Sequence, residues 1–130
     1  LNAVQFRSYD DGLHNNIGNT FQMLNRPDEA IIYHRKALKI NSADARSWVN
    51  LGNAYLMKSL NDSSLIAFER AIEVNQNYAG AWLSLGNCLE RLDRKEDALK
   101  AYFRAVHLNP NYEEYVESRE KVLNKGIIDD

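Results

Sequence analysis

Apolar residues recur along the chain at the spacing of one face of a helix. Trp48, Leu51 and Tyr55 stand at positions i, i+3 and i+7, and Leu65 and Phe68 begin a second run with the same spacing. Neither run alternates as a half-buried strand would. The pattern predicts an all-α chain. The helices are expected over residues 11–24, 27–40, 45–58, 61–74, 79–92, 95–108 and 113–125.

A period of 34 residues organises these helices. Trp48 and Gly52 align with Trp82 and Gly86, and a step of 34 in the other direction reaches Gly18. A fixed period of 20 to 50 residues is typical of solenoids, because a single helix pair cannot bury its apolar face alone and must stack on its neighbours. The sequence therefore predicts stacked helical hairpins.

The columns of the repeat resemble those of the tetratricopeptide repeat (TPR) family. The run from Trp48 to Tyr55, followed by Phe68 and Ala71, carries the family pattern, which returns in register one period later. The chain departs from it at three positions, which are His14, His34 and Ser64. The resemblance implies a right-handed α-α superhelical solenoid of three hairpins, with a partial repeat at the N-terminus and a C-terminal capping helix.

The repeat boundaries follow from this alignment. Residues 1–10 are expected to end a preceding repeat, and residues 113–126 to form a capping helix with a polar outer face, as the end of a solenoid requires. Residues 127–130 are expected to form a loose tail. The three complete repeats are expected at residues 11–44, 45–78 and 79–112.

Three glycines lie in the middle of predicted helices, although each costs about 1 kcal/mol relative to alanine. Because this cost recurs in register at Gly18, Gly52 and Gly86, we expect the backbone to be closely approached there. The expected partners are the small residues Ala30, Ser64 and Ala98 of the second helices, while Phe68 and Tyr102 fill the space between hairpins.

The expected starts of the second helices also repeat. Asn25, Ser59 and Asp93 are residue types that favour the N-cap position, so we expect each to cap the helix that follows. Pro27 fits the first turn, where its missing N–H is not needed.

Charge and composition exclude several function classes. The chain has 16 basic and 18 acidic residues among its 130, and this balance gives no basic stripe for nucleic acid or for direct contact with a membrane surface. The sequence contains no apolar stretch of spanning length and no signal-peptide layout. We expect a soluble chain, with the cytoplasm favoured; because the sequence begins with Leu1, it is expected to be part of a longer protein.

Candidate catalytic groups are few and scattered. None of His14, His34 and His107 has a partner at metal-ligand spacing, and the two in aromatic columns are expected to pack rather than to bind metal. Cys88 stands in a small-residue column, which predicts a buried thiol rather than a nucleophile. We therefore expect a non-catalytic chain without cofactor or metal.

The resemblance places the first helix of each repeat on a concave face. Asparagines are frequent among the residues expected there, and an amide can donate to and accept from a peptide group at once. Asn16 and Asn50 form one expected row, and Asn19, Asn53 and Asn87 form another. Gln22, Leu56 and Glu90 are also expected to face inward. The set expected to bind a peptide is Asn15, Asn16, Asn19, Met23, Arg46, Val49, Asn50, Asn53, Met57, Leu83, Ser84, Asn87 and Arg91.

One binding mode of the family is not expected. Some TPR domains clamp the acidic C-terminal tail of heat-shock chaperones with basic residues beside two asparagines. Asn19 and Asn50 match those asparagines, but Asn15, Gly80 and Ser84 stand in the basic columns. Because charge-assisted bonds to a carboxylate are lost, we predict no tight binding of such a tail.

Three hypotheses for function follow. The first is an interaction module that holds an extended peptide or a partner helix on the concave face. The second is a substrate-recruiting arm of a larger enzyme, since the amide ladder is similar to that of the TPR arms of protein O-glycosyltransferases. The third is self-association through the chain ends, where Val4 and Phe6 are apolar.

Overall fold

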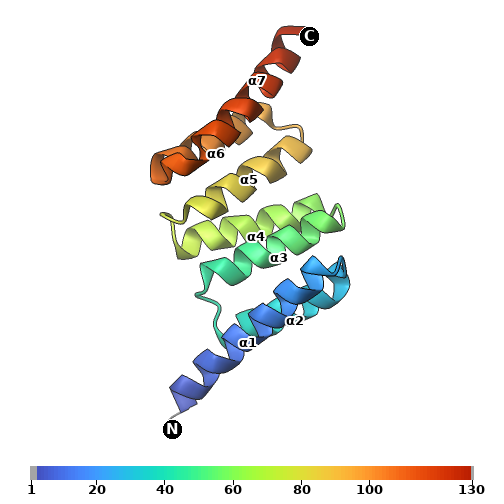
Figure 1. Ribbon diagram of the computed structural model, residues 1–130, viewed down its shortest axis with the longest axis vertical. Helices are drawn as coiled ribbons and strands as arrows, with labels where there is room; N and C mark the ends of the chain where they lie inside the picture. The colour runs from blue at the N-terminus through green and yellow to red at the C-terminus, as the bar shows by residue number, and fades with distance from the viewer. Residues whose placement is uncertain (1–2, 130) are drawn as a thin grey trace.

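The computed structural model describes residues 3–129, and within them the chain is entirely helical apart from short connections. Figure 1 shows the helices stacked in chain order, with the two termini at opposite ends of the molecule. The elements are α1 (Ala3–Met23), α2 (Pro27–Ile40), α3 (Ala45–Met57), α4 (Asn61–Val74), α5 (Ala79–Arg91), α6 (Lys95–Leu108), the short 3₁₀ helix η1 (Pro110–Tyr112) and α7 (Glu113–Asp129).

Consecutive helices pack as hairpins. The most extensive contacts join α1 to α2, α3 to α4 and α5 to α6, and smaller contacts join each hairpin to the next through α2–α3 and α4–α5. The 3₁₀ helix and α7 pack on α6. This arrangement confirms the predicted all-α solenoid of helix pairs and the helix bounds expected in its middle.

Both ends differ from the prediction. Helix α1 begins at Ala3 and continues without a break to Met23, so residues 3–10 extend the first helix and do not end a separate one. The segment contains no proline, and Gly12 alone does not interrupt the helix. At the other end α7 continues to Asp129, so most of the expected loose tail is helical. Residues 1, 2 and 130 lie outside the described range.

The N-cap prediction for Asn25, Ser59 and Asp93 was wrong. These residues have φ angles of 58°, 58° and 59°, the left-handed conformation that ends a helix. In the second hairpin the N–H of Ser59 donates to the carbonyl of Leu56 (2.9 Å) and that of Leu60 to Tyr55 (2.9 Å), the bond pair of a Schellman motif. The turns are so short that these residues must end the preceding helix. The N-caps are Arg26, Leu60 and Arg94, without side-chain capping bonds.

The glycine columns make room for rings. A Cβ built on Gly18 would lie 2.6 Å from Cε1 of His34, and the ring of Phe68 occupies the space that a Cβ on Gly52 would need. Tyr102 covers Gly86 in the same way in the third hairpin. All three rings are fully buried. The close approach to the three glycines was predicted correctly. The group that approaches each glycine, however, is a ring of the second helix and not a small residue.

The expected small partner is nevertheless present beside Gly52. The hydroxyl of Ser64 donates to the carbonyl of Gly52 (3.0 Å), so the two helix backbones do lie close together. Phe68 also belongs to a core cluster that contains Ala81 and Cys88 of α5, so its ring fills the space between hairpins as predicted.

A second repeated device joins one hairpin to the next. The side-chain oxygens of Asn41, Asn75 and Asn109 each accept a bond of 3.0–3.1 Å from the backbone N–H two residues later. The indoles of Trp48 and Trp82 donate to loop carbonyls in the same connections, each over 2.8 Å. The connections are therefore fixed by side chains, as Asx turns are.

The ring contact predicts opposite effects for one kind of substitution at two glycines. Gly52→Ala forces a methyl group into the Phe68 ring and should lower the free energy of unfolding by about 1–3 kcal/mol. Gly12→Ala, at an exposed helical position with nothing within 4 Å, should raise it by about 0.5–1 kcal/mol. Urea unfolding of both variants measures the two changes. Equal shifts in either direction would contradict the ring contact.

Candidate peptide-binding face

The first helices of the three hairpins lie next to one another. Helix α3 contacts both α1 and α5, so the exposed residues of these helices form one surface, here called the first-helix face. Figure 1 shows α1, α3 and α5 succeeding one another along the stack. This is the surface to which the sequence assigned peptide binding.

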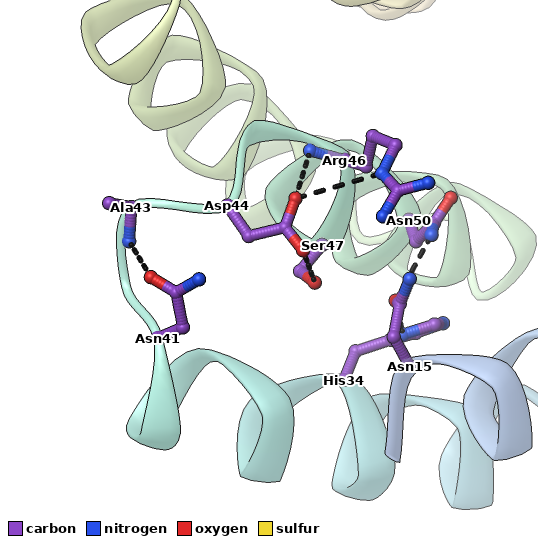
Figure 2. Close-up of polar contacts among 8 residues, drawn as sticks. All are labelled: Asn15, His34, Asn41, Ala43, Asp44, Arg46, Ser47 and Asn50. Carbon is purple, nitrogen blue, oxygen red and sulfur yellow. Dashed lines mark hydrogen bonds and ion pairs between the residues drawn. The ribbon is translucent and has the colours of Figure 1, made fainter. Parts of the chain in front are cut away.

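At the junction of the first two hairpins the polar residues bond to each other. Figure 2 shows Asn15 of α1 between His34 of α2 and Asn50 of α3. Oδ1 of Asn15 lies 3.0 Å from Nδ1 of His34 and accepts from the amide of Asn50 over 3.1 Å. Asn15 is only 6% exposed. These amides therefore join α1 to α2 and α3. Asn15 was predicted to bind a peptide, but it is buried and does not line a groove.

Burial decides the charge of His34. Its ring is fully buried, and this burial lowers the pKa of the imidazole to about 4, so the ring is neutral at pH 7. Nδ1–H then donates to Asn15, and Nε2 faces the side-chain amide of Gln22. A neutral imidazole has one donor and one acceptor, so both ring nitrogens are satisfied when Gln22 turns its NH₂ group toward Nε2.

Several predicted residues are open on the first-helix face. Asn16, Arg46 and Arg91 are exposed, and Met57 and Met23 present large apolar side chains, Met23 being 87% exposed. Among the described contacts, the half-buried amides of Asn19 and Asn53 make no side-chain hydrogen bond. This leaves the face between the first and second hairpins rich in available amides and flexible apolar groups.

The third hairpin is different because its polar residues hold α7. Oδ1 of Asn87 accepts from the hydroxyl of Tyr115 over 2.7 Å, and the hydroxyl oxygen of Tyr102 lies 2.7 Å from the same atom. Glu90 accepts from Tyr102 (3.0 Å) and from two nitrogens of Arg119 (2.9 and 2.6 Å). Burial, and then the bond to Glu90, raise the pKa of Tyr102, so its hydroxyl keeps its proton. Asn87 is thus engaged within the fold.

Other predicted residues also serve the interior. Val49 and Leu56 are buried, so their assignment to the groove was wrong. Val49 and Leu56 both belong to the core cluster that contains Phe68, because they are apolar side chains on the inner side of α3. Arg91 donates to the carbonyl of Leu56 over 2.9 Å, which links α5 back to α3. Leu83 and Ser84 are half-buried on α5.

Of the candidate catalytic groups, Cys88 and His14 pack against neighbouring residues, whereas His107 is exposed. Burial raises the pKa of the Cys88 thiol to about 11, and its Sγ donates to the carbonyl of Asn61 over 3.4 Å. His14 packs edge-on against Tyr33, with ring centroids 6.0 Å apart. Within the described residues, no three His, Cys, Asp or Glu side chains could together hold a metal ion. No described helix has the length and apolarity to cross a bilayer.

The described part of the surface has two hollows, one beside the first-helix face and one between second helices. One, of 510 Å³, lies between the α2–α3 and α4–α5 connections and is lined by Arg46 and Tyr78. The other, of 490 Å³, lies between α2 and α4 and includes Arg35, Lys39 and Trp48. The second hollow was not predicted from the sequence, although Arg35 and Lys39, four residues apart on α2, are a signal of its basic edge.

The neutral state of His34 makes folding depend on pH. The unfolded state takes up a proton below about pH 6.5, whereas the folded ring does so only near pH 4, so stability should fall as pH decreases from 6.5 to 4. His34→Phe, which copies Phe68, should remove about 1–3 kcal/mol of that loss, since one pKa unit corresponds to about 1.4 kcal/mol. Urea unfolding of both proteins between pH 7 and pH 4 measures the difference. Parallel pH profiles would show that His34 is not buried in its neutral form.

Comparisons with known proteins agree with the geometry. The tetratricopeptide repeat signature matches residues 13–44 and 79–112, and a second signature of the same description matches residues 45–78. A search of curated protein sequences finds no match.

Solved structures share the fold at low sequence identity. The Arabidopsis OM64 TPR domain superposes with a TM-score of 0.88 at 22% identity, covering 92% of this chain and 98% of that one. The first TPR of Spaghetti (RPAP3), bound to the HSP90 peptide SRMEEVD, gives 0.82 at 22% identity, with coverages of 90% and 95%. The crystal structure of MamA gives 0.84 at 22% identity, with coverages of 90% and 68%. With helix pairs, repeat length and signatures in agreement, the chain belongs to the tetratricopeptide repeat family.

Proposed function

We propose that this chain is a non-catalytic interaction module that holds an extended peptide on the first-helix face, across α1 and α3. The observation that carries the proposal is the pair Asn19 and Asn53. These amides are one repeat apart on neighbouring helices and make no side-chain bond among the described contacts. A TPR domain of the same fold is bound to a peptide, which supports a peptide as the partner.

The chemistry of the pair favours recognition of the peptide backbone. A side-chain amide can accept from a peptide N–H and donate to the neighbouring C=O, so it binds without reading the peptide's side chains. Met23 and Met57 lie at the ends of α1 and α3 and are exposed, and methionine adapts to ligands of different shape. The third hairpin contributes less to this proposal because Asn87 is bonded to Tyr102 and Tyr115.

The predicted residues Asn15 and Asn50 play a supporting part. Their mutual bond and the bond to His34 fix the position of α1 relative to α3, which sets the distance between the two free amides. Replacing either residue would disturb packing as well as binding. The test therefore uses Asn19 and Asn53.

Backbone recognition predicts a specific pattern of losses. Peptides selected from a random display library on the wild-type chain should bind about tenfold or more weakly to Asn19→Ala/Asn53→Ala. N-methylation of the central peptide amides should weaken binding similarly, whereas alanine replacement of the peptide's polar side chains should change it little. Fluorescence anisotropy with labelled peptides measures all three.

The matched control is Asn77→Ala/Asn124→Ala, which removes two exposed amides elsewhere and should leave affinity unchanged. The peptide SRMEEVD supplies a further comparison and should bind weakly, because Asn15, Gly80 and Ser84 provide no cation for its carboxylates. Equal loss in both double variants, or tight binding of SRMEEVD, would contradict backbone recognition through Asn19 and Asn53.

The other two hypotheses concern context. A recruiting arm of a larger enzyme would use the same face, and the sequence of the full-length protein would decide between an arm and an independent module. The side chains of Val4 and Phe6 lie outside the described set, so self-association through the chain ends stays a hypothesis. Light scattering of the protein at high concentration would test it.

A further inference from the structure

A hollow on the second helices has a chemistry of its own. It has a volume of about 490 Å³ and lies between α2 and α4. The residues that α3 contributes lie on the side of this helix opposite to the first-helix face. Its lining is mainly apolar, with basic residues contributed by α2. The lining residues are Arg35, Leu38, Lys39, Ser42, Trp48, Leu51, Tyr55, Ser63, Ile66 and Ala67.

The apolar part is open to solvent chiefly at Ile66 of α4, which is 61% exposed. Trp48 and Tyr55 of α3 are half-buried, and Leu51 lies buried beneath them. The indole N–H of Trp48 is already bonded to the carbonyl of Ser42 (2.8 Å), so its ring needs no polar ligand. A large apolar side chain entering the hollow would cover surface that water now covers, which favours binding.

The basic part lacks acidic partners. Arg35 and Lys39 are four residues apart on α2, so they lie on the same side of the helix. No described carboxylate forms an ion pair with either residue. Arg35 donates one N–H to the hydroxyl of Tyr55 over 2.7 Å, which holds the guanidinium at the hollow and leaves its other donors free. The site thus offers two cations at one edge of an apolar surface.

The equivalent positions of the next repeat show that the fold does not require this chemistry. One period later, Glu69 and Glu73 replace Arg35 and Lys39, and Lys100 replaces Ile66. The helices pack in the same way in both repeats. A basic edge with an exposed Ile66 is therefore a property of this hollow and is not a packing rule of the repeat.

We propose that the hollow between α2 and α4 binds an acidic segment of a partner protein through one large apolar side chain flanked by carboxylates. The apolar side chain lies against Trp48 and Ile66, and the carboxylates pair with Arg35 and Lys39. The volume is within the range of about 300–1,000 Å³ that ligand pockets commonly have. This site lies on a different surface from the first-helix face and does not depend on the function proposed for that face.

The two tryptophans provide a site-specific measurement. Trp48 lines the hollow, whereas Trp82 holds the same column in the next repeat. The probe is the blocked pentapeptide Asp-Glu-Phe-Glu-Asp, titrated into ¹⁵N-labelled protein. The indole N–H resonance of Trp48 should shift to saturation while that of Trp82 stays in place. The peptides Asn-Gln-Phe-Gln-Asn and Asp-Glu-Ala-Glu-Asp should each bind about tenfold or more weakly.

Paired variants separate the two parts of the site. Arg35→Glu/Lys39→Glu, which copies the next repeat, should weaken binding about tenfold or more. The control Lys36→Glu/Arg104→Glu makes the same change in net charge at exposed positions outside the lining and should leave affinity within about twofold. Ile66→Lys should weaken binding, and Ile32→Lys, at another exposed isoleucine, should not.

Three results would overturn the proposal. They are equal shifts of both indoles, equal affinity for the acidic and amide peptides, and equal losses in the two charge-reversal pairs. Absence of any shift up to millimolar peptide would overturn it as well. A normal urea midpoint for each variant ensures that a loss of binding reflects the site and not unfolding.

Discussion

The structure depends on one contact made three times, the packing of a buried ring against a helical glycine. His34, Phe68 and Tyr102 each occupy space that a side chain at the facing glycine would need. Because the glycine allows the two helices of a hairpin to approach, the ring can reach the core beneath the next hairpin, as Phe68 does with Ala81 and Cys88. The same contact therefore sets the geometry within hairpins and between them.

The polar residues attached to these rings explain why the first-helix face is uneven. His34 bonds Asn15 and faces Gln22, while Tyr102 bonds Asn87 and Glu90. A phenylalanine cannot make such bonds, and Asn53, one repeat before Asn87, makes no side-chain bond among the described contacts. Variation within one ring column thus decides which amides are used by the fold and which remain available to a ligand. The proposed peptide site lies where the amides remain available.

Much of the fold could be predicted from the sequence because its determinants are local and periodic. The 34-residue spacing of Trp48 and Trp82 and the glycine column identified the hairpins and their order. The left-handed residues of the short turns were mistaken for N-caps, since the same residue types favour both positions. For the site, Asn15 could not be recognised as buried, because its partners stand 19 and 35 residues away. The bonds between Asn87 and α7 depend in the same way on packing of distant segments.

The most direct test of the ring contact is a double-mutant cycle between Gly52 and Phe68. If the ring occupies the space above the glycine, Gly52→Ala should be costly in the wild type but nearly neutral beside Phe68→Leu, where the side chain is smaller. We expect a coupling energy of about 1 kcal/mol or more from urea unfolding. An equal cost of Gly52→Ala in both backgrounds would mean that the ring and the glycine act independently, so the ring would not occupy the space above Gly52.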